Sequence, residues 1–153
     1  MYYPQCIDFI FYKWYNVLNT KLWGDSMDTE KTRSYYENKT RDNVCQCDYC
    51  QNFIDEVKGV YPEIAEYLSS LGVDIEIPFE VFLPIETQDD YMDYYGVQYL
   101  IAGNNEGFQE TEIGNISVRI AACHPDATYK GEYFVIELGT FHIKCRYDKY
   151  KFK

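Results

Sequence analysis

The chain has 153 residues, of which 46% are hydrophobic, and a formal net charge of −11 at pH 7. This length suits one domain with a sizeable core, and the hydrophobic content with only five prolines argues against disorder. A pI near 4.5 disfavours binding to nucleic acid or to an anionic membrane, because the chain offers no basic stripe to meet phosphates.

The first 44 residues do not point to one type of secondary structure. Apolar residues between Ile7 and Trp23 alternate as in a strand and fit one face of a helix equally well. The aromatic and β-branched content favours a strand. Residues 24–44 are polar, and within them we expect a short helix over Glu30–Asn38.

Two consecutive helices are predicted over residues 48–72. Asp48 can cap the first helix, and Gln51 three residues later completes a capping box. Pro62 can open the second helix at its first position, and Gly72 can end it. Apolar residues at helical spacing give each helix one face to bury against a sheet.

Beyond residue 80 the apolar side chains recur at every second position, which predicts strands. Pro84 marks an edge strand or a bulge, because proline cannot donate a ladder hydrogen bond. The clearest predicted strands are 97–102, 116–121, 133–138 and 141–146.

Two tight turns connect predicted strands. Gly114-Asn115 predicts a two-residue hairpin loop, and Gly139-Thr140 predicts a second hairpin. The second hairpin would place Glu137 opposite His142 or Lys144. We therefore predict an α+β fold, in which an antiparallel meander of about five strands over about residues 80–147 carries a helical pair on one face. A single domain covering residues 1–153 is expected.

The net charge is concentrated in one stretch. Sixty residues between Lys58 and Arg119 contain no Lys, Arg or His but twelve carboxylates, whereas the rest has thirteen acids and fourteen bases. A one-signed region attracts cations or a basic partner, although a merely solvated acidic surface is the alternative. We predict a partner-binding surface on one side of the molecule, with Tyr94 and Tyr95 as aromatic anchors. Its carboxylates would be Asp89, Asp90, Asp93, Glu106, Glu110 and Glu112.

A second feature is the C-x-C-x-x-C motif of Cys45, Cys47 and Cys50. Tetrahedral zinc needs four ligands, usually thiolates and imidazoles, and the chain has no second paired knuckle. A fourth zinc ligand would have to come from Cys6, Cys123, His124, His142 or Cys145.

Three other interpretations of these cysteines are open. Cys47 and Cys50 have redox spacing at a helix start, but no thioredoxin-like βαβ pattern surrounds them. Cys50 and His124 could form a nucleophilic pair, but nothing in the sequence brings them together. The sequence favours a third interpretation, in which small buried thiols pack the start of the helix.

The string C-Q-C-D-Y-C-Q-N-F from Cys45 to Phe53 resembles small acidic proteins of Gram-positive bacteria for which no activity is known. Segments 62–74, 95–99, 124–125 and 134–139 are similar to the same group, so the resemblance covers roughly residues 40–146. It implies a single α+β domain, and it transfers no functional residue.

These observations favour a non-enzymatic binding protein, such as an inhibitor, immunity or anti-defence protein, whose acidic surface meets a basic protein. Since neither a secretory signal nor a transmembrane stretch is visible, we expect a cytoplasmic location and free thiols. The alternative is a zinc-stabilised accessory domain built on Cys45, Cys47 and Cys50. A thiol redox protein or cysteine enzyme is the third candidate.

Overall fold

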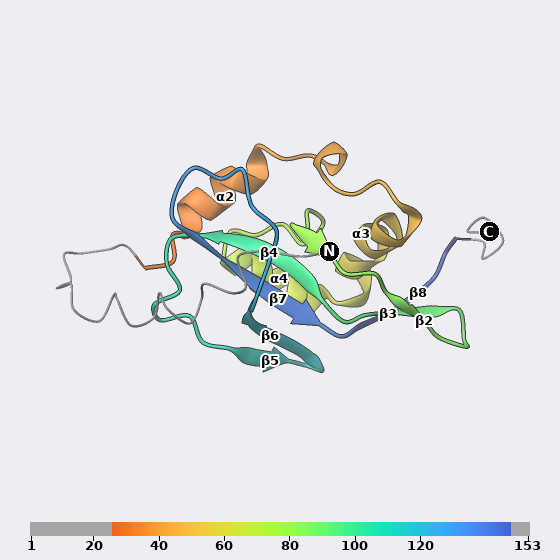
Figure 1. Cartoon of the computed structure of the whole chain (residues 1–153). Coiled ribbons are helices and arrows are strands. Elements are labelled where there is room, and N and C mark those ends of the chain that lie inside the picture. The colour runs from red at the N-terminus through yellow and green to blue at the C-terminus, as the bar shows by residue number, and fades with distance from the viewer. Residues whose placement is uncertain (1–25, 148–153) are drawn as a thin grey trace.

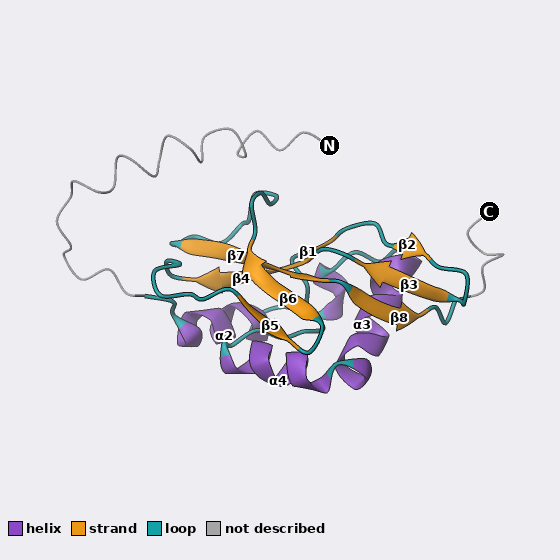
Figure 2. Ribbon diagram, turned by 90° about the horizontal axis from the view of Figure 1, so that it is seen from below, coloured by secondary structure: helices purple, strands orange, loops and turns teal. Residues whose placement is uncertain are grey.

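The structure is a computed structural model that describes residues 26–147 of the chain. Helices form one layer and strands form another, as Figure 2 shows from below. The strand expected between Ile7 and Trp23 lies outside the described residues. The helical elements are α2 (Thr29–Glu37), the 3-10 turn η2 (Arg41–Asn43), α3 (Asp48–Val60) and α4 (Pro62–Ser70).

The helix boundaries follow local chemistry, with one correction. Pro62 occupies the first position of α4, and Gly72 follows its end with a φ of 83°, as predicted. The prediction that Asp48 caps α3 is wrong, because Asp48 is already helical and Cys47 occupies the cap position. Gln51 closes no capping box; its Nε2 donates to the carbonyl of Cys45 at 2.8 Å.

The strands form two antiparallel sheets, so the predicted α+β class and the five-stranded antiparallel sheet are confirmed. Figure 1 shows the smaller sheet at one end of the molecule. The larger sheet has the order β1 (Glu80–Val81), β4 (Val97–Ala102), β7 (Tyr133–Gly139), β6 (Ile116–Ile120) and β5 (Thr111–Ile113). The smaller sheet has the order β2 (Ile85–Glu86), β3 (Tyr91–Tyr94) and β8 (Phe141–Lys144).

The strand order departs from a simple meander. The hairpin at Gly114-Asn115 is confirmed, since Ile113 pairs with Ile116. However, β4 lies beside β7 instead of β5. Pro84 lies between β1 and β2, where the chain leaves one sheet for the other.

The predicted hairpin at Gly139-Thr140 is wrong. Both edges of β7 are already occupied, by β4 and by β6, so β8 pairs with β3 in the second sheet. Glu137 therefore faces Arg119, with 3.4 Å between its Oε1 and the arginine Nη2. His142 instead engages Asp93, with 2.6 Å between Nδ1 and Oδ1.

A buried polar contact fixes the start of α3 against the smaller sheet. Asn52 is buried, and its Nδ2 donates to the Tyr94 hydroxyl and to the carbonyl of Lys144, both at 3.2 Å. Its Oδ1 accepts the backbone N–H of Arg146 at 2.9 Å. The Tyr94 hydroxyl in turn donates to the carbonyl of Tyr49 at 2.8 Å. Three segments, α3, β3 and the end of β8, thus share one satisfied polar network, which holds the start of α3 in place.

Replacing Asn52 with Ala should lower the free energy of unfolding by about 2–4 kcal/mol, since buried partners of Asn52 lose their hydrogen bonds. Urea unfolding followed by circular dichroism measures this loss. The matched control is Asn105→Ala, at an exposed position, with an expected change below about 0.5 kcal/mol. Equal stability of the two variants would show that the Asn52 network does not anchor the helix.

Candidate metal centre

Three thiols meet at the start of α3. The Sγ atoms of Cys45, Cys47 and Cys50 all lie within 4.8 Å of one another. Thiolates around a tetrahedral zinc ion lie roughly 3.8 Å apart, because each Zn–S bond is about 2.3 Å long. Small side-chain rotations would therefore bring these three sulfur atoms to bonding distance of one ion.

Local backbone geometry explains why the thiols converge. Cys47 is extended at the cap position, with φ −68° and ψ 153°. Cys45 and Cys47 are two residues apart before the helix, and Cys50 follows in its first turn. The Gln46 amide holds the preceding turn by donating to the carbonyls of Arg41 and Val44, both at 2.8 Å. The Gln46 side chain thus holds this segment next to the start of α3.

The exposure of the thiols corrects the packing interpretation that the sequence favoured. Cys50 is 6% exposed and does pack the start of the helix. Cys45 and Cys47 are exposed, so neither fills a core position. Simple packing therefore explains one of the three cysteines.

The three thiols do not ionise alike. Hydrogen bonds from Cys47, above all from its backbone N–H, lower the pKa of the Cys45 thiol. Burial, followed by the neighbouring Cys47 thiol, raises the pKa of Cys50 well above its usual range. A buried thiol that resists ionisation is a poor nucleophile, so this geometry gives little support to a redox or catalytic role for Cys50. A bound cation would reverse the effect, because a metal-coordinated thiol loses its proton.

The predicted fourth ligands do not join the thiol group among residues 26–147. His124 places Nδ1 2.8 Å from the carbonyl oxygen of Pro125, and its ring packs near Phe79 and Tyr133. His142 is engaged with Asp93 in the smaller sheet. Cys123 and Cys145 also lie outside the group, and Cys6 falls outside the described residues.

A cavity of about 220 Å³ adjoins the three thiols, which all line it. The opposite wall is the segment from Pro78 to Pro84, which contains β1. That wall is mostly apolar, and Glu80 is the one carboxylate among the lining residues. Sequence reasoning did not single out Glu80, because the residue is thirty positions from Cys50 and belongs to a two-residue strand.

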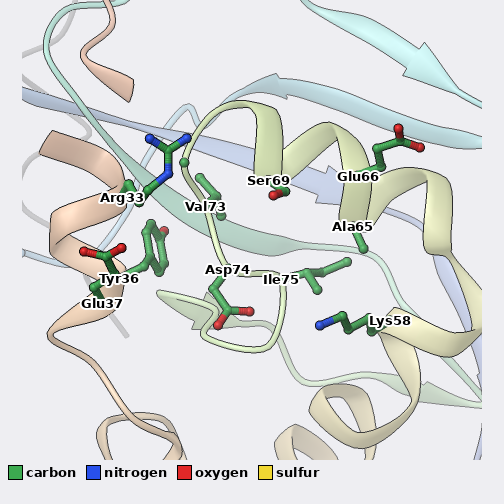
Figure 3. Close-up of a pocket in the computed structure, with 11 residues that line it drawn as sticks. Arg33, Tyr36, Glu37, Lys58, Ala65, Glu66, Ser69, Val73, Asp74 and Ile75 are labelled. Carbon is green, nitrogen blue, oxygen red and sulfur yellow. The ribbon is translucent and has the colours of Figure 1, made fainter. Parts of the chain in front are cut away.

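A larger cleft of about 470 Å³ lies where α2, α3, α4 and residues 72–75 meet. Figure 3 shows that its charged side chains carry both signs and point in different directions. Its cations are paired, Arg33 with Glu30 at 2.5 Å and Lys58 with Glu76 at 3.5 Å. Since no set of polar groups converges in this cleft, we assign it no function.

The predicted acidic surface is divided between two places. Asp89 and Asp90 lie in the β2–β3 turn at one end of the molecule (Figure 1). The connection from β4 to β5, which carries Glu106 and Glu110, begins at the opposite end (Figure 1, Figure 2). Glu112 follows on β5. The prediction that these carboxylates share one side is therefore wrong.

The individual residues of the predicted surface also differ in their surroundings. Tyr94 is 0% exposed, so its predicted role as a surface anchor is wrong, whereas Tyr95 is 44% exposed. Asp93 is half-buried and paired with His142. Glu110 supports the chain by accepting the backbone N–H of Ile120 at 3.1 Å. The remaining carboxylates of the set, Asp89, Asp90, Glu106 and Glu112, are exposed.

Comparison with protein-family models, with curated proteins and with solved structures finds no match for this chain. The resemblance to proteins of Gram-positive bacteria accordingly stays an expectation. Within residues 26–147, no helix combines the length and the apolar character that crossing a membrane requires. The candidate site therefore has to be interpreted from its own geometry.

Proposed function

We propose that this chain is a zinc-stabilised binding domain, in which the thiolates of Cys45, Cys47 and Cys50 hold one Zn²⁺ ion. The observation that carries the proposal is the mutual distance of the three Sγ atoms, all within 4.8 Å. The exposure of Cys45 and Cys47 adds support, because a coordinating role accounts for thiols that no core needs.

Thiolate ligands select soft or borderline ions, and zinc is the common one without redox chemistry. An iron–sulfur cluster is less well supported, because such clusters are usually held by four cysteine thiolates. The filled d shell of Zn²⁺ favours no particular arrangement of its ligands, so the ion can adapt to the short loop that these cysteines form while taking four ligands.

The ion would stabilise the fold locally. Bonds to Cys45, Cys47 and Cys50 would join the extended segment before α3 to the first turn of the helix. Binding to the folded chain alone stabilises it by about 2.7 kcal/mol when free zinc is at one hundred times its dissociation constant. The proposed role is therefore structural, and it adds to the anchoring by Asn52.

Purified protein should contain one zinc ion per chain, and chelation should lower its melting temperature, since metal–thiolate bonds contribute folding free energy. Metal analysis and thermal unfolding measure both effects. In a double variant, Cys45→Ser with Cys47→Ser, the zinc and its thermal effect should be lost. Both positions are exposed, so the replacements should not disturb the core.

The matched control is Cys123→Ser, which changes another exposed thiol outside the group and should retain zinc. Zinc that persists in the double variant, or a wild-type protein that binds none at micromolar concentration, would contradict the proposal.

We also propose that the end of the molecule at the β2–β3 turn binds a basic protein partner. The observation in favour is a combination of acidic and apolar groups at this end. Ile85 is 61% exposed and lies directly opposite Asp93 in the β2–β3 ladder, and Leu83 and Tyr95 are exposed nearby in sequence. Exposed apolar anchors with an acidic rim are suited to a partner with the complementary pattern.

Two variants of equal charge can test this location. Asp89→Asn with Asp90→Asn neutralises the β2–β3 turn, and Glu106→Gln with Glu112→Gln neutralises two carboxylates elsewhere. Asn tolerates the φ of 60° at position 90. With a partner co-purified from the native host, only the first variant should slow association at low salt, on the order of tenfold.

Surface plasmon resonance at low and high salt measures this rate. If both double variants slow association equally, net charge is responsible and the β2–β3 end is not the contact.

A further inference from the structure

Glu80 is the one carboxylate that borders the cavity beside the thiols. It is the first residue of β1, and its backbone is positioned by pairing with Gln98 on β4. Its negative charge also acts on the Cys45 thiol, whose pKa it tends to raise. Glu80 therefore lies near the thiols, although its carboxylate is not part of the group whose ligand atoms lie within 4.8 Å of one another.

No cation balances Glu80 among residues 26–147. The carboxylate takes part in no salt bridge of this region, although the residue is half-buried. Burial raises its pKa, and only a hydrogen bond from the backbone N–H of Val81 opposes that effect. A half-buried carboxylate without a cationic partner is unfavourable when ionised, and a cation between it and the thiols would balance its charge.

Glu80 lies on a short strand at the edge of the larger sheet. β1 is an edge strand with β4 as its one neighbour, and it lies between Pro78 and Pro84. A charged residue on a short edge strand often serves only to prevent pairing with other chains. That simpler role does not account for a half-buried carboxylate that borders the thiol cavity, so coordination explains more of the observations.

We infer that Glu80 supplies the fourth ligand of the zinc centre, by rotation of its side chain toward the three thiols. This inference rests on the proposed binding of zinc by Cys45, Cys47 and Cys50. A carboxylate oxygen binds zinc at about 2.0–2.2 Å, and three thiolates with one carboxylate complete a tetrahedral set. The ion then bridges the start of α3 and the edge of the larger sheet, two parts of the chain that α3 and α4 separate.

Cobalt(II) is the probe for this ligand set, because it replaces zinc and absorbs light according to its ligands. The wild-type protein should show sulfur-to-cobalt charge transfer from three thiolates. In Glu80→Cys the fourth ligand becomes sulfur, so this absorption should rise by about one third, and the d–d bands should move to lower energy. Glu80→Gln should still bind one zinc ion, with an affinity lowered by about 10–100-fold.

Two controls separate the alternatives. Glu86→Cys introduces a thiol on β2, outside the residues that line the cavity, and should leave the cobalt spectrum unchanged. Cys6 was also a candidate fourth ligand from the sequence, and it lies outside the described residues. Cys6→Ser should likewise leave the cobalt spectrum unchanged.

Each other outcome overturns a defined part of the account. If Glu80→Cys leaves the spectrum unchanged, or if Cys6→Ser removes a thiolate, Glu80 is not the fourth ligand although the zinc centre stands. If the wild-type protein shows no sulfur-to-cobalt absorption, the zinc centre itself is wrong, and the assignment of Glu80 fails with it.

Discussion

The anchoring of the first turn of α3 is the constraint on which the candidate site depends. Asn52 joins that turn to β3 and to the end of β8 through three hydrogen bonds, and Phe53 packs between the rings of Tyr94 and Phe141, with centroids 5.1 and 5.2 Å away. Because Cys50 belongs to the same turn, its sulfur atom has a fixed place against the sheet layer. A thiol group on a freely moving loop would lose more entropy on binding an ion.

Electrostatics link the site to the composition of the chain. The stretch between Lys58 and Arg119 carries twelve carboxylates and no Lys, Arg or His. A carboxylate of this stretch can therefore form an ion pair only with a basic side chain from outside it. Glu76 is engaged by Arg41 and Lys58, and Asp93 by His142. Glu80 has no such partner among the described residues, and a metal ion would supply the missing positive charge.

Local signals in the sequence predicted local structure well, and long-range partners poorly. Pro62, Gly72 and Gly114-Asn115 each determine the backbone within a few residues, which is why those boundaries were correct. The hairpin predicted at Gly139-Thr140 was wrong because β8 pairs with the free edge of β3, about fifty residues earlier in the chain. The three thiols were recognisable from their spacing, whereas Glu80 borders their cavity only because of the tertiary fold. The predicted acidic surface was divided because the β2–β3 turn and the β4–β5 connection lie at different ends of the molecule (Figure 1).

The central claim is that the thiol group is a metal centre completed by a carboxylate. X-ray absorption spectroscopy at the zinc edge of the loaded protein tests it most directly, because sulfur and oxygen neighbours differ in distance and scattering. The account predicts three sulfur atoms at about 2.3 Å and one oxygen atom at about 2.0 Å from the ion. A shell of oxygen and nitrogen atoms alone, or of four sulfur atoms, would contradict it.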